Sequence, residues 1–210
     1  GQGSQLCPKF ADPDFAGHTF QAMGKGYAFA CFLLGLQSAL LWAGDALFHI
    51  WSVNDPLFSN ENLLLPAIFP LTAWSAAISE ETIFRLFALG LFMRWFQNAG
   101  IAALAASFLW ALGHTAYPVY PVYTRLVEVT ILGLFFSAVF FKYGFVTSLF
   151  THAAFNSVLM ALSIMSMGGG LNIFAGILYV ASPAIAAVVI CLWRHLQTVR
   201  LRPLRLKQRE

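Results

Sequence analysis

Apolar runs of about 20 residues recur along this chain of 210 residues, and runs of that length can span a bilayer core of about 30 Å. Charged residues make up only 10% of the chain, far below the roughly 25% of soluble domains. The sequence therefore predicts an all-α, polytopic membrane helical bundle with about six transmembrane helices. The expected spans are residues 24–53, 62–97, 99–115, 124–142, 145–166 and 171–197.

The transmembrane part of the chain is expected to be one domain, because no fixed-period repeat or low-complexity linker divides it. Residues 1–23 are polar and are predicted to be a soluble lead-in. Residues 24–197 are predicted to form the single transmembrane domain, and residues 198–210 a basic tail.

The second apolar run is too long for one ordinary span. It contains Pro66 and Pro70, which lack the amide hydrogen that a helix interior needs. We therefore expect a kinked or interfacial lead-in there, followed by a helix over about 73–96.

Lysine and arginine favour cytoplasmic loops, and they are unevenly placed in this chain. They precede the first span, follow the second and the fourth, and make up much of the tail, whereas the connections on the other side hold only Arg125. We therefore expect an integral, multi-pass protein of a prokaryotic cytoplasmic membrane, with both termini cytoplasmic. The tail is predicted to contact headgroups of the lipid bilayer, and no nucleic acid is expected as a partner.

Three charged residues stand within the stretch EETIFR at 80–85, inside the second apolar run. On a helix, Glu81 and Arg85 are neighbours in the order that favours an ion pair. Glu80 is rotated from Glu81 by roughly 100° and can face another group. All three could form a buried structural network, but such a network needs only one acid per arginine. The surplus Glu80 therefore indicates a functional carboxylate, with Glu81 and Arg85 in support.

Two later spans carry a histidine with a neighbour one helical turn away. His114 follows Trp110, a supporting aromatic residue, and His152 precedes Asn156. Residues four apart project from the same face of a helix. Either pair alone is also compatible with core packing or with a hydrogen bond between helices. Together with Glu80, they would bring a free carboxylate, two imidazoles and a carboxamide into one intramembrane site.

In this order, EETIFR at 80–85, WALGH at 110–114 and HAAFN at 152–156 resemble the three motifs of the CPBP family, the CAAX proteases and bacteriocin-processing enzymes, also called the Abi family. The resemblance extends over about residues 62–170. Family members commonly have a glycine directly after the arginine, where this chain has Leu86. The resemblance implies a membrane-embedded protease like the type II CAAX prenyl endopeptidases, of either glutamate type or metallo type.

Peptide hydrolysis requires an activated water, a stabiliser for the oxyanion and a proton donor for the leaving amine. Glu80 is the candidate general base, and His114 could share its water and return the proton. Asn156 and His152 offer hydrogen-bond donors to the oxyanion. These catalytic roles coincide with those that the resemblance implies for the matching positions.

Metal dependence is an open point of the predicted site. Glu80, His114 and His152 could ligate a catalytic zinc with an open fourth position. However, the chain has no His-Glu-x-x-His helix, and the amide of Asn156 is a poor zinc ligand beside thiolate or imidazole. We expect a metal-free mechanism that needs no cofactor and keep zinc as the alternative.

We therefore predict an intramembrane endopeptidase that hydrolyses a peptide bond near the membrane, in a peptide or membrane-protein substrate. One alternative is a non-catalytic relative that binds a peptide or a membrane protein, as in bacteriocin immunity. Another is a proton-coupled transporter, because membrane carboxylates often carry protons, although no half-repeat typical of transporters is evident. The sequence leaves open the substrate, the oligomeric state and the membrane face to which the site opens.

Overall fold

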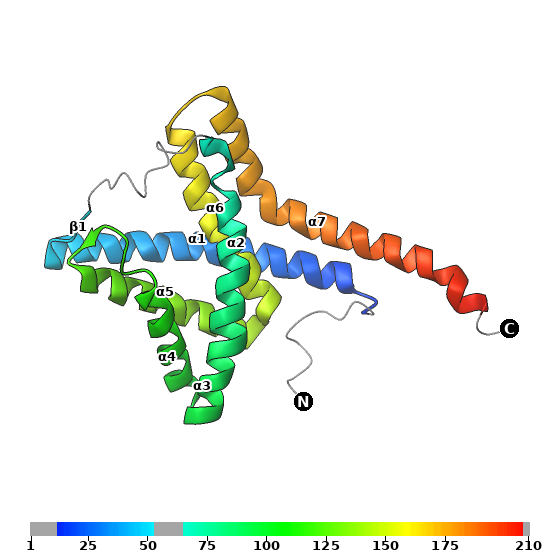
Figure 1. Cartoon of the computed structure of the whole chain (residues 1–210), viewed down its shortest axis with the longest axis horizontal. Helices are drawn as coiled ribbons and strands as arrows, with labels where there is room; N and C mark the ends of the chain where they lie inside the picture. The colour runs from blue at the N-terminus through cyan, green and yellow to red at the C-terminus, as the bar shows by residue number, and fades with distance from the viewer. Residues whose placement is uncertain (1–11, 53–64, 208–210) are drawn as a thin grey trace.

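The computed structural model describes residues 12–52 and 65–207, and helices make up most of this part of the chain (Figure 1). Four of the described helices are long and apolar enough to cross a membrane. They are α1 (Phe15–Phe48), α5 (Val122–Tyr143), α6 (Phe145–Ser166) and α7 (Gly170–Lys207, with its candidate span within Gly170–Val199). The prediction of an all-α, polytopic membrane bundle is thereby confirmed.

The helix that carries EETIFR runs without a break over residues 71–96 and is the upright green helix of Figure 1. It comprises α2 (Leu71–Glu80), the π-helical segment η4 (Glu81–Ala88) and α3 (Leu89–Phe96). A short 3-10 helix, η3 (Pro66–Ile68), precedes it. Proline is tolerated at the start of a helix but not in its interior, so the lead-in that the prolines predict is present. Residues 62–64 of that lead-in lie outside the described residues.

Helix α1 begins and ends earlier than the predicted span over residues 24–53. Pro13 lies just before the helix, and proline is favourable next to a helix start. Hydropathy marks the part of a helix that crosses the membrane, but not the turn that starts it. Residues 15–23 therefore extend the helix, and residues 12–14 precede it, while residues 1–11 of the expected lead-in lie outside the described part of the chain.

Helix α4 (Ala99–Leu112) is shorter than predicted. Its 14 residues reach about 21 Å at a rise of about 1.5 Å per residue, which is less than the bilayer core. It begins where the Asn98 side chain accepts a hydrogen bond from the Ile101 amide at 3.1 Å, as an N-cap residue does. The span expected over 99–115 is thus not a complete crossing, and His114 lies in the turn that follows α4.

Two short strands fix the loop that follows α4. Strand β1 (Trp51–Ser52) pairs antiparallel with strand β2 (Val119–Tyr120). The rings of Trp51 and Tyr120 stack with their centroids 4.8 Å apart. The chain just after α1 is therefore joined to the segment between α4 and α5, beside the polar residues described below.

Small residues allow the helices to approach closely. A Cβ atom on Gly26 of α1 would lie 2.7 Å from the Phe150 Cβ of α6, and one on Gly133 of α5 would lie 2.8 Å from the Ser107 Cβ of α4. Membrane helices associate through such contacts, because lipid supplies no hydrophobic drive between them. The helices α1, α4, α5 and α6 consequently share one core, in which Trp110 and Phe136 are buried.

Candidate active site

The π-helical segment η4 holds a buried ion pair between its first residue, Glu81, and Arg85. The amide of Leu89 donates to the carbonyl of Phe84, five residues back, and such widened turns are frequent at functional sites. Within this segment Nη1 of Arg85 lies 3.4 Å from Oε1 of Glu81, and both side chains are almost completely buried. The predicted pairing of these two residues is therefore present in the structure.

Glu81 also fixes the position of His152 on α6. Its Oε1 accepts a hydrogen bond from His152 Nδ1 at 2.9 Å, and its Oε2 accepts one from the Ser148 hydroxyl at 2.5 Å. The carboxylate thus orients the imidazole ring through Nδ1. Nε2 of His152 is left as the nitrogen that faces Glu80.

Arg85 is enclosed by aromatic rings. Its guanidinium carbon lies 4.7 Å from the Trp110 ring centroid and 5.1 Å from that of Phe136, and cations are attracted to aromatic faces at this range. Its nitrogens Nε, Nη1 and Nη2 are buried and make no hydrogen bond within the described residues. Glu81 at 3.4 Å is therefore the nearest described countercharge to a fully buried cation.

Glu80 differs from its neighbour because its side chain reaches a cavity. About 24% of this side chain is exposed, whereas Glu81 is fully buried. The indole Nε1–H of Trp110 donates to Oε2 of Glu80, and His152 Nε2 lies 3.8 Å from the same oxygen. The two neighbouring glutamates therefore have different surroundings: Glu81 is packed between helices, and Glu80 lies at a polar cavity.

His114 presents one nitrogen to the same cavity. Its Nδ1 lies 3.0 Å from the backbone carbonyl of Trp110, and a carbonyl oxygen can only accept, so Nδ1 carries a proton. In the neutral ring Nε2 is then the unprotonated nitrogen. The Trp110 and His114 rings meet edge to face with their centroids 4.8 Å apart.

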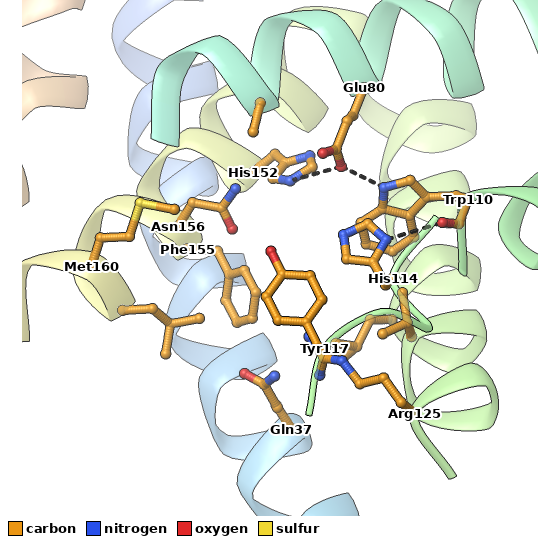
Figure 2. A pocket seen from close by; sticks show the side chains of 14 residues that line it. Gln37, Glu80, Trp110, His114, Tyr117, Arg125, His152, Phe155, Asn156 and Met160 are labelled. Carbon is orange, nitrogen blue, oxygen red and sulfur yellow. Dashed lines mark hydrogen bonds and ion pairs between the residues drawn. The ribbon is translucent and has the colours of Figure 1, made fainter. Parts of the chain in front are cut away.

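The four residues predicted to be catalytic line one cavity of about 200 Å³, shown in Figure 2. They are Glu80, His114, His152 and Asn156. Figure 2 shows the Asn156 amide lying beside His152 at this cavity. The structure thus brings the carboxylate, both imidazoles and the carboxamide together from α2, the turn after α4, and α6.

A metal ion in this cavity would need several of these side chains around one position. In the described part of the chain, no three His, Cys, Asp or Glu side chains are arranged to hold one ion. Nδ1 of His114 and of His152 each donate to an oxygen, which leaves Nε2 of both rings free, as in histidines that bind a metal. The structure thus shows no preformed three-ligand group among the described residues, the metal-free mechanism stays a prediction, and zinc stays the alternative.

Five residues near the site were not assigned to it from the sequence. Tyr117 and Arg125 line the cavity together with Gln37, Ser148 holds Glu81, and Glu128 binds Arg125. Arg125 and Glu128 are three apart, a spacing that could have predicted their pairing on a helix. A serine or glutamine in an apolar helix carries little signal of this kind.

These features define a polytopic membrane protein with a glutamate and histidine site enclosed by its helices. The resemblance inferred from the three motifs is confirmed by comparison with protein families. Residues 62–158 match the model of the family described as type II CAAX prenyl endopeptidase Rce1-like.

A curated relative shares part of the same region. The sporulation-killing factor biosynthesis protein SkfC of Bacillus subtilis (strain 168) is 32% identical over 89 residues. The match covers 42% of this chain and 18% of SkfC, so the chain corresponds to about a fifth of that protein. No solved structure is significantly similar to the chain.

Proposed function

We propose that the protein is an intramembrane endopeptidase in which Glu80 is the general base that activates water. The observation that carries this proposal is the different environment of two adjacent glutamates. Glu81 is buried and bound by Arg85, Ser148 and His152, whereas Glu80 faces a cavity shared with His114. The match of residues 62–158 to the model of an endopeptidase family supports the same function.

In the first step, Glu80 takes a proton from a water in the cavity while the water oxygen attacks the carbonyl carbon of the substrate. The unprotonated Nε2 of His114 accepts a hydrogen bond from the same water. Positioned proton transfer of this kind contributes about 10²–10⁴-fold to rate. The Trp110 indole N–H fixes one carboxylate oxygen and leaves the other to receive the proton.

The substrate carbonyl oxygen becomes negative as the tetrahedral intermediate forms. The Asn156 amide donates to it, and His152 donates through Nε2 when its ring is doubly protonated, because Nδ1 is committed to Glu81. Preorganised donors stabilise this charge. When the C–N bond breaks, the proton taken from water passes through Glu80 or His114 to the leaving amine, which balances the hydrolysis.

The test is a comparison of the wild-type protein with the Glu80→Gln variant. Each is reconstituted in lipid vesicles with a mixture of apolar peptides, and cleavage products are followed by mass spectrometry. We expect Glu80→Gln to lower the rate by about 10²–10⁴-fold without loss of the folded protein. Ser79→Ala, an exposed change on the same helix, is the control and should retain activity.

Two results would argue against the proposal. If Glu80→Gln cleaves as fast as wild type, Glu80 is not the base. If the wild-type protein binds peptides but cleaves none of them, the alternative of a non-catalytic binding protein is supported instead.

A further inference from the structure

A cation lies at the opposite end of the cavity from Glu80. Arg125, in the first turn of α5, lines the same cavity, and Figure 2 shows Glu80 at its upper end and Arg125 at its lower end. Only 15% of its side chain is exposed. The proposed hydrolysis assigns this arginine no role.

The guanidinium of Arg125 is held by one of its nitrogens. Nη1 donates to both oxygens of Glu128, at 2.9 and 2.8 Å, and Oε1 of Glu128 also accepts from Nε2 of Gln37 at 2.9 Å. Nε of Arg125 is buried and makes no hydrogen bond within the described residues, and the hydrogen bonds to Glu128 come from Nη1 alone. Arginine binds carboxylates through pairs of parallel N–H groups. Nη2 and the buried, unpaired Nε form the pair that remains once Nη1 is occupied, and a carboxylate that reached them would give Nε the acceptor that it lacks.

Stacked rings connect Arg125 to the proposed catalytic residues. Its guanidinium carbon lies 5.1 Å from the Tyr117 ring centroid, and the Tyr117 and His114 rings stack with their centroids 5.8 Å apart and an angle of 10°. These two separations place the guanidinium carbon no more than about 11 Å from the His114 ring. An extended peptide advances about 3.3–3.6 Å per residue, so this distance corresponds to about three residues.

We propose that Arg125 is a specificity-determining residue that binds a carboxylate of the peptide substrate, within about three residues of the bond that is cleaved. This inference rests on the proposed function. The carboxylate is supplied by the C-terminus of the substrate or by an aspartate or glutamate side chain, since both present the same two oxygens. Glu128 orients the guanidinium, and because it also offsets the charge, recognition depends on hydrogen-bond geometry as well as attraction.

The experiment measures peptide binding separately from cleavage. Glu80→Gln protein in lipid nanodiscs is titrated with fluorescent ten-residue peptides of alanine, leucine and phenylalanine, and binding is followed by fluorescence anisotropy. One peptide has a free C-terminal carboxylate, a second has a C-terminal amide, and a third has the amide and one internal glutamate. We expect at least one of the two carboxylate peptides to bind about tenfold or more tightly than the neutral one.

Three variants in the Glu80→Gln background test whether Arg125 causes the preference for a carboxylate peptide. Arg125→Lys keeps a positive charge for Glu128 but lacks the pair of parallel N–H groups. The double change of Arg125→Gln with Glu128→Gln removes both charges, so that neither is left buried and unpaired. Both should lose most of the preference while remaining folded. Arg94→Gln, an exposed arginine in the last turn of α3, is the control and should keep it.

The results distinguish the two sources of the carboxylate and test the inference itself. Preference for the free acid identifies the C-terminus, and preference for the internal glutamate identifies a side chain. Equal binding of all three peptides, no binding of any, or a preference that survives both Arg125 changes would overturn the inference. Because the assay needs no turnover, its outcome is independent of whether the wild-type protein cleaves peptides.

Discussion

Glutamine in place of Glu81 should destabilise the protein far more than glutamine in place of Glu80. Glu81 is fully buried and provides the nearest described countercharge for Arg85. Glutamine retains the shape of the side chain but leaves the guanidinium uncompensated, and breaking a buried ion pair in this way costs about 3–5 kcal/mol. Glutamine at Glu80 retains an oxygen for the indole of Trp110 at a cavity-facing position, and we expect it to cost less than about 1 kcal/mol.

The assay is equilibrium unfolding of the purified protein in mixed detergent micelles. If the cost at Glu81 comes from an orphaned cation, adding Arg85→Met to Glu81→Gln should recover about 1–3 kcal/mol, because methionine fills the space between Trp110 and Phe136 without a charge. Equal stability of the two glutamine variants, or additive losses in the double variant, would refute this account of the ion pair.

Three further predictions follow from individual contacts. Trp110→Phe keeps the ring but removes the N–H that holds Glu80, so kcat in a peptide-cleavage assay should fall about tenfold or more, and an unchanged kcat would contradict that role. Gly26→Ala should lower the free energy of unfolding by about 1–3 kcal/mol, because the added Cβ would meet Phe150. Gly24→Ala, with open space around it, is the control and should be neutral or stabilising. Equal effects of the two changes would show that α1 does not approach α6 so closely. Treatment with EDTA should leave the cleavage rate unchanged, with metal content checked by elemental analysis, and a loss restored by zinc would establish the zinc alternative.

The sequence predicted the polar centre of the molecule well because charged residues in an apolar helix are rare. Glu80, Glu81 and Arg85 stood out for this reason, and their spacing predicted which acid would pair with the arginine. The histidine motifs were harder to interpret singly. Only their combination indicated a common site, and the structure places them around one cavity.

Other features leave little trace in a single sequence. The π-helical segment has the same residue types as an α-helix, so its widened turn was not predicted. Ser148 was missed because a serine in an apolar helix usually bonds to its own backbone, whereas here it donates to Glu81. Arg125 was interpreted only as a marker of topology, since hydropathy does not show that a residue near a helix start faces inward.

The ends of the helices were also predicted poorly from the sequence. Hydropathy averages over a window, so it continued the third span past Leu112 and started the first one after the true beginning of α1. Capping residues decide where a helix begins and ends. Asn98, at the start of α4, is the clearest example in this chain.

The central claim is that Glu80 and His114 act on one water, and a kinetic double-mutant cycle tests it most directly. Cleavage rates are measured for wild type, Glu80→Gln, His114→Gln and the double variant. Residues that act as a unit give strongly non-additive losses, so the double variant should be little slower than the slower single variant. Losses that multiply would show that the two side chains act independently and would contradict the account.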